Sequence, residues 1–182
     1  MGKRIKEGGD SKQEKTAHRK ISSKVKSKTR KPKTEQQIVE RMRKRCVQLA
    51  KDISKERDGW RCCYCKVGKP QRRMHSHHFF HEGLYKSMSA DIDNLITLCA
   101  MHHQGGFGWK SHDTFNFHNT PAESTQWFID NYPERYAALK ERTKTTQQLN
   151  MLYWNNKYLE LCKTHLTSTQ SNSNELSTYQ NL

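Results

Sequence analysis

Histidine and cysteine are concentrated in one stretch of this 182-residue chain. The segment Trp60–His118 holds eight of the ten histidines and four of the six cysteines. Its densest part is the run MHSHHFF, Met74–Phe80, which contains three histidines. Imidazole binds transition metals, and because it titrates near neutral pH it can also take a proton from water. We therefore predict that this segment forms a chemical site and not only a core.

Two pairs of metal-binding residues flank that run. Cys62 and Cys65 in CCYC are separated by two residues, and Cys99 and His102 in CAMH have the same spacing. Three thiolates and one imidazole make a closed tetrahedral set, so we predict a structural Zn²⁺ bound by these four residues. Cys63 is the alternative to Cys62, and reduced cysteines without a metal are the alternative to the whole site.

More histidines are present than one zinc site uses. With His102 assigned to zinc, seven others remain in the segment: His75, His77, His78, His81, His103, His112 and His118. Hydrolysis of a phosphodiester needs a base that activates water and a cation at the leaving oxygen. A histidine is suited to be that base, because imidazole titrates near neutral pH. On a regular strand His77 points to the opposite face from His78, so the two are not expected to share one pocket.

Together these motifs resemble those of the HNH endonucleases, which have a ββα-metal fold. The resemblance is carried by RDGWRCCYC, HSHHF and DNLITLCAMHH, and it covers about Arg57–Lys140. The following HNTPAESTQWFIDNYPERYAALK is similar to the helical extension of phage recombination nucleases of the NinG (Rap) kind. The resemblance implies an α+β fold, in which a zinc-bound ββα finger is flanked by helices.

The same resemblance implies a role for each member of the site. His78 matches the histidine that ends a strand, Asn94 the asparagine of the returning loop, and His103 the histidine that opens the next helix. His78 would activate water and Asn94 would orient His78. His77 matches the metal ligand that the family places just before the base, on a distorted turn, and His75 is its alternative. On composition alone, Asn94 could equally be a turn-forming residue.

The last metal ligand departs from the family pattern. Related sites place it one helical turn after the first, but glycines at 105, 106 and 108 interrupt any helix there, and residue 107 is not histidine. We expect the chain to loop out and return a ligand from His118, with His112 as the alternative. The ion is expected to be Mg²⁺ or Mn²⁺, although such a site would also hold Zn²⁺ or Ni²⁺.

The positive charge lies mostly at the N-terminus. Residues 1–45 contain 17 Lys and Arg against 5 Asp and Glu, which is about +12 of the net +15. We predict that residues 1–33 form a disordered basic arm that meets DNA phosphates; a solvating or targeting tail is the alternative. The cations assigned to this contact are Lys24, Lys26, Lys28, Arg30, Lys31 and Lys33.

The remaining organisation follows from apolar spacing and helix punctuation. Ile38, Met42, Cys46, Leu49 and Ile53 predict a leading helix over residues 34–58. The core is expected at 59–120, with positive φ at Gly68. A helical extension follows at 121–165, where Thr120 and Glu123 form a capping box, Pro133 starts a second helix, and Leu149, Leu152, Tyr153 and Leu159 suggest a third. Cys46 and Cys162 are expected to fill apolar helix positions. Residues 166–182 are expected to be a disordered polar tail.

The sequence thus predicts a metal-dependent DNA endonuclease, with 5′-phosphate and 3′-hydroxyl ends implied by the resemblance. Branched recombination DNA is a compatible substrate. The alternatives are a non-catalytic zinc-finger protein that binds nucleic acid and an RNA-binding accessory factor. No membrane span, secretory signal or small-molecule cofactor is expected, so we expect the protein in the cytoplasm, that of the bacterial host if it is phage-encoded. The sequence leaves the oligomeric state open.

Overall fold

The computed structural model describes residues 32–68, 71–105 and 115–179, with side chains as far as residue 167. Contacts divide the chain into the units Met1–Pro32 and Lys33–Leu182, and all described elements belong to the second. Lys33 is exposed, whereas the other five arm cations predicted to bind DNA lie outside the described residues. None of the described helices is long and apolar enough to cross a membrane.

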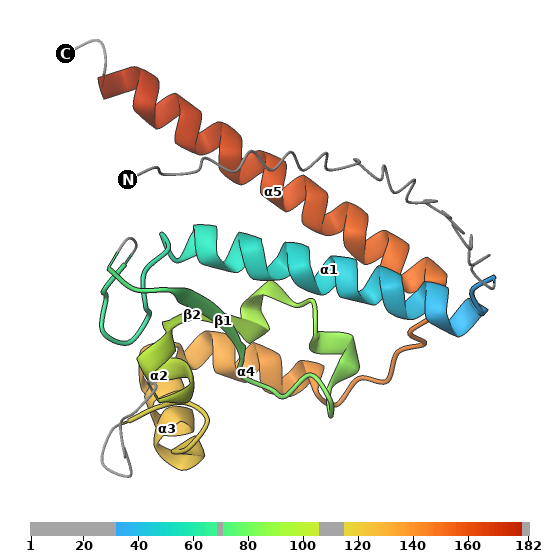
Figure 1. Ribbon diagram of the computed structural model, residues 1–182, viewed down its shortest axis with the longest axis horizontal. Coiled ribbons are helices and arrows are strands. Elements are labelled where there is room, and N and C mark those ends of the chain that lie inside the picture. Colours follow the sequence, from blue (N-terminus) through green and yellow to red (C-terminus); the bar gives the residue numbers. More distant parts are fainter. Residues whose placement is uncertain (1–31, 69–70, 106–114, 180–182) are drawn as a thin grey trace, which may run out of the picture. The chain divides into compact units, whose positions relative to one another are not determined.

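The described unit is a mixed α+β structure with one two-stranded antiparallel sheet (Figure 1). Two short 3-10 turns, η1 (Lys86–Met88) and η2 (Ile92–Asn94), lie between the two strands. The other elements, in chain order, are α1 (Glu35–Arg57), β1 (Met74–His78), β2 (Leu95–Cys99), α2 (Ala100–Gln104), α3 (Pro121–Asn131), α4 (Pro133–Arg142) and α5 (Met151–Tyr179).

Helix α1 begins and ends where the sequence predicts. Thr34 caps its N-terminus through a capping box with Gln37, so that two backbone N–H groups of the first turn are satisfied. Its buried side chains lie in the second half of the helix, where Cys46, Ala50 and Ile53 are fully or almost fully buried. This half packs against α5 and the sheet (Figure 1).

The strand register places the histidines of β1 on two faces. His77 pairs with Ile96 and His78 with Leu95, and successive side chains point to opposite sides. On the α1 side, the Ser76 hydroxyl donates to the Lys51 carbonyl oxygen at 2.9 Å and lies 3.2 Å from the Ser54 hydroxyl. His75 and His77 therefore project away from α1.

Two apolar cores hold these elements together. Ile96 and Leu98 of β2 pack with Phe117, Phe128 and Leu139, which brings α3 and α4 under the sheet. Trp154 and Leu161 of α5 pack with residues of α1 to form the second core. Cys46 belongs to this second core, as its apolar position predicts, and Cys162 is half-buried.

The C-terminal elements differ from expectation in two ways. Thr120 is the N-cap of α3, but its side chain does not cap the helix; its hydroxyl donates to the Asn116 carbonyl oxygen at 2.8 Å, so the predicted capping box with Glu123 is wrong. Helix α5 continues to Tyr179 and thus runs through most of the segment expected to be disordered. Its sequence contains no glycine or proline that would end it.

Candidate metal centres and the surrounding site

The four residues predicted to bind zinc lie together. The ligand atoms of Cys62, Cys65, Cys99 and His102 are all within 4.8 Å of one another. The sulfurs of Cys65 and Cys99 are 3.9 Å apart, and His102 Nδ1 is 3.6 Å from the Cys62 sulfur and 3.3 Å from the Cys99 sulfur. A tetrahedral zinc requires about 3.8 Å between two sulfurs and about 3.6 Å between sulfur and nitrogen. This group could hold a metal ion, and its geometry fits zinc.

A tight turn brings Cys62 and Cys65 together. The Cys62 N–H donates to the Val67 carbonyl oxygen at 2.9 Å, and the Lys66 N–H donates to the Cys62 carbonyl oxygen at 2.8 Å. Lys66 has φ +61°, so it supplies the positive φ that was predicted at Gly68. Gly68 is needed for space instead, because a Cβ there would lie 3.2 Å from the Arg61 side chain and 3.3 Å from the Trp60 carbonyl oxygen.

The pKa values of the Cys62 and Cys99 thiols are shifted in opposite directions. Burial raises the pKa of Cys62 to about 12. Burial also opposes ionisation of Cys99, but the His102 backbone N–H and the Arg72 guanidinium outweigh it and lower the pKa of Cys99. A cation that bound all three thiolates would therefore displace at least the Cys62 proton. Cys63 lies outside the group, next to Asp58 and Tyr132.

A second group contains three histidines. Ligand nitrogens of His77, His103 and His118 lie within 4.8 Å of one another, and Nε2 of His103 is 3.3 Å from Nε2 of His118. Two imidazole nitrogens on one ion are separated by about 3.3 Å in tetrahedral and about 3.0 Å in octahedral geometry. The three come from β1, α2 and the segment before α3, so the group depends on the tertiary fold.

Burial favours the neutral ring of two members of this group. Desolvation, together with the neighbouring histidines, lowers the pKa of His77 to about 3 and that of His103 to about 4. His77 and His103 therefore carry lone pairs at neutral pH, as metal ligands must. Nδ1 of His103 is buried and has no hydrogen-bond partner in the described part of the chain. Two half-buried imidazoles and one exposed imidazole that converge on one point are a donor set that suits a divalent ion.

The alternatives for this group are placed differently. His75 stacks on His103 with ring centroids 5.2 Å apart and the planes at 12°, so it packs against the group without joining it. His112 lies outside the described residues. His81 is held in its own turn, where its Nδ1 accepts from the Gly83 N–H at 3.1 Å.

His78 lies at the end of β1, on the opposite face of the strand from His77. Its Nε2 is 2.8 Å from the Ser89 carbonyl oxygen, which accepts only if Nε2 carries the proton. In a neutral ring, Nδ1 then holds the lone pair. The Glu82 carboxylate lies 3.9 Å from the same Nε2 and is itself 3.6 Å from Arg43. Burial lowers the pKa of His78, which favours the neutral ring.

Asn94 is fully buried and binds the loop that follows β1. Its amide nitrogen donates to the carbonyl oxygens of Phe80 at 2.9 Å and Met88 at 3.1 Å, and its amide oxygen accepts from the Phe80 N–H at 2.7 Å. The Phe79 N–H also donates to the Asn94 carbonyl oxygen at 2.9 Å. Asn94 thus ties the end of β1 to the segment that contains Ser89, the partner of His78.

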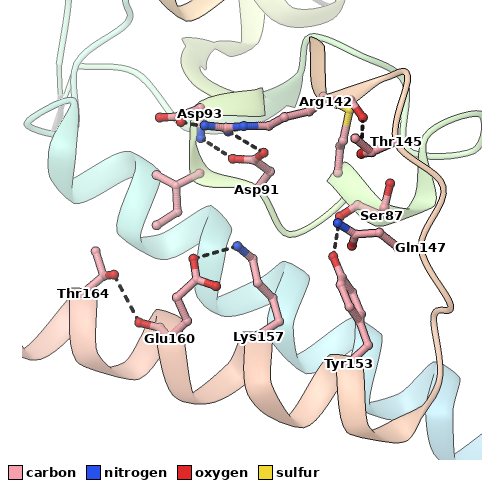
Figure 2. A pocket seen from close by; sticks show the side chains of 12 residues that line it. Ser87, Asp91, Asp93, Arg142, Thr145, Gln147, Tyr153, Lys157, Glu160 and Thr164 are labelled. Carbon is pink, nitrogen blue, oxygen red and sulfur yellow. Dashed lines mark hydrogen bonds and ion pairs between the residues drawn. The ribbon is translucent and has the colours of Figure 1, made fainter. Parts of the chain in front are cut away.

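Three arginines hold the Asn94 turn from outside. Arg57 of α1 and Arg135 of α4 both donate to the Leu95 carbonyl oxygen. Arg142 donates to Asp91 at 2.7 Å and to Asp93 at 2.9 Å, at the edge of a pocket of about 510 Å³ (Figure 2). This pocket contains no residue of either metal-binding group, and its ionic side chains pair with one another: Arg142 with two aspartates, and Lys157 with Glu160. The pocket therefore lies where α4, α5 and the turn that contains Asn94 meet, and its ion pairs help to hold them together.

No family model, curated protein or solved structure matches the chain. The roles of the site residues therefore rest on their geometry alone. Sequence reasoning missed Ser89 and the three arginines. Their partners are mostly backbone carbonyl oxygens up to 43 residues away, and no sequence pattern marks such pairs.

Proposed function

We propose that this protein is a metal-dependent nuclease of the HNH kind that hydrolyses phosphodiester bonds in DNA. The main support is that helix α2 contributes adjacent histidines to both groups: His102 to the set that fits zinc and His103 to the three-histidine group. A zinc bound at His102 would fix a helix of only five residues and hence the direction of His103. Such support is expected where a ligand must be held accurately for catalysis.

The reaction needs a base, and His78 is the candidate. With its Nε2 proton donated to Ser89, Nδ1 is the nitrogen that would take a proton from the attacking water. Because His77 lies on the opposite face of β1, this role requires the end of the strand to turn the His78 ring toward the ion. Asn94 acts through the backbone, because it fixes the loop that presents Ser89. His77, His103 and His118 would hold a divalent ion, which stabilises negative charge on the leaving oxygen.

The charge of the chain supports a nucleic acid as the substrate. The net charge is +15, and most of the excess lies in the first 45 residues, so the protein would attract a polyanion over a long range. Closer to the site, Arg73 and Lys55 are near enough to lower the pKa of His75, and Lys51 adds to the lowering at His103. Arg73 and Lys51 could meet the phosphates beside the scissile bond, whereas Lys55 is 15% exposed and pairs with Asp52.

The test is single-turnover cleavage of linear, nicked and four-way-junction DNA with Mg²⁺ or Mn²⁺. His78→Ala should lower the cleavage rate by a factor of at least about 10², while DNA binding and zinc content are retained. His81→Ala is the matched control, since that ring is bound within its own turn, and it should cleave at nearly the rate of the unmodified protein. Cleavage at an unchanged rate by His78→Ala would refute the assigned base. No cleavage of any substrate with either ion would favour a zinc-stabilised binding protein.

A further inference from the structure

Helix α5 presents a line of exposed leucines. Leu152 is 67% exposed, Leu159 59% and Leu166 61%, and they are half of the six large hydrophobic side chains that are exposed in the described part of the chain. Isolated exposed leucines are common on soluble proteins and need no explanation. Three exposed leucines spaced by seven residues on one helix are not isolated, so their exposure requires an explanation.

The spacing puts all three on one side of α5. Seven residues are nearly two helical turns, so the three side chains form a stripe along the helix axis, which we call the leucine stripe. Trp154 and Leu161 lie two residues after Leu152 and Leu159, about 200° around the helix, and both are buried in the core with α1. The leucine stripe therefore faces directly away from α1, the helix that α5 packs along (Figure 1).

We propose that the leucine stripe binds the leucine stripe of a second copy of this chain, with two α5 helices forming a short coiled-coil seam. Leucines seven residues apart return to the same line of contact, and identical stripes are complementary to each other about a two-fold axis. Asn155 and Cys162 lie between the leucines, so the seam has one leucine per heptad and not the two apolar residues of a standard coiled coil. Leu159 is the middle residue, so it faces its counterpart in a parallel pair and also in an antiparallel pair centred on it.

Charge favours a protein partner over nucleic acid on this face. Between Leu152 and Leu166 the exposed residues include one acid, Glu160, and one base, Lys163, so the face is neutral in a chain of net charge +15. This face therefore has no excess of positive charge that would attract phosphate. Two copies also bring no excess of like charge together along the seam, which is a requirement for self-association.

The size of the leucine stripe predicts weak association. From Leu152 to Leu166 the helix rises about 21 Å, which is too short to bury the roughly 800 Å² per partner of a standard stable interface. We therefore expect a monomer–dimer equilibrium with a dissociation constant in roughly the micromolar range. Each substitution in the leucine stripe acts twice in a two-fold dimer, so single variants should have clear effects.

Sedimentation equilibrium of the full chain tests this inference, at concentrations from about 1 to 500 μM. The DNA-free, zinc-loaded protein is used at high salt, which screens repulsion between its basic segments. The unmodified chain should show concentration-dependent dimers, and Leu159→Gln should raise the dissociation constant at least about tenfold. The triple change Leu152→Gln, Leu159→Gln, Leu166→Gln should leave only monomers. These side chains are exposed, so circular dichroism and zinc content should not change.

The matched control is Leu84→Gln, which removes a leucine that is 80% exposed but lies in the loop after β1. Its dissociation constant should equal that of the unmodified chain. A chain that stays monomeric over the whole range would overturn the inference and leave the leucine stripe to another partner. Dimers that persist in the triple variant, or that are lost in Leu84→Gln, would overturn it as well.

Discussion

Replacing Asn94 by alanine tests the structural basis of the site. The Asn94 side chain is fully buried and makes three hydrogen bonds, two donated to carbonyl oxygens and one accepted from the Phe80 N–H. Alanine would leave three backbone groups without their partner, and each such group costs about 1–3 kcal/mol when it stays buried. Partial access of water to these groups reduces the total. We expect the free energy of unfolding to fall by about 3–5 kcal/mol, a large part of the roughly 5–15 kcal/mol of a typical domain.

The assay is urea unfolding of the zinc-loaded protein, followed by tryptophan fluorescence. Asn131→Ala is the control, because that amide is exposed and makes one hydrogen bond within its own helix, to the Trp127 carbonyl oxygen at 2.8 Å. The control should lose less than about 1 kcal/mol. If Asn94→Ala also lost less than about 1 kcal/mol, Asn94 would not be what holds the loop to β1, and its proposed positioning of His78 would fail.

Three further predictions concern the zinc set, the histidine group and the arm. Cys65→Ser should abolish tight binding of one zinc and unfold the region around β1 and α2, which metal analysis and circular dichroism would detect. The pKa of His77 is about 3 in the folded chain and about 6.5 in an unfolded one, so the unfolded state takes up its proton first as pH falls. With the three-histidine group metal-free, the free energy of unfolding should therefore decrease from about pH 6.5 down to about pH 3. Urea unfolding at several pH values should show a less steep decrease in His77→Asn. Removing residues 1–33 should weaken binding to all DNA sequences about equally and flatten its salt dependence, whereas single-turnover cleavage at saturating DNA should persist.

The local features of the fold could be predicted because each rests on residues close in sequence. The capping residue Thr34 and the apolar spacing after it fixed the position of α1. The C-x-x-C pair and the C-x-x-H pair were sufficient to predict which residues form the zinc set, because chelation by such pairs depends on spacing and residue type. Successive side chains of a strand lie on opposite faces, so the placement of His77 and His78 on different faces also followed from the sequence.

Other features depend on tertiary contacts and could not be read in this way. The sequence favoured His118 over His112 as the last histidine, but its approach to His77 and His103 depends on the position of the segment before α3. The bonds from Arg57 and Arg135 end on backbone carbonyl oxygens, which every residue has, so no residue type identifies them. Helix α5 continues through a polar segment that contains no glycine or proline. Its packing with α1 comes from residues before that segment, so the composition of the segment alone did not predict a helix there.

The central claim is that one fold holds a structural zinc and a separate ion used in cleavage. The most direct measurement is the single-turnover rate of DNA cleavage as Mn²⁺ is added to protein that retains one tightly bound zinc but has been freed of weakly bound metal. We predict no cleavage without added ion, saturable recovery as Mn²⁺ is added, and no recovery in His103→Ala, whose zinc content should be unchanged. Cleavage that does not respond to the added ion, or a His103→Ala protein that recovers like the unmodified chain, would contradict the account.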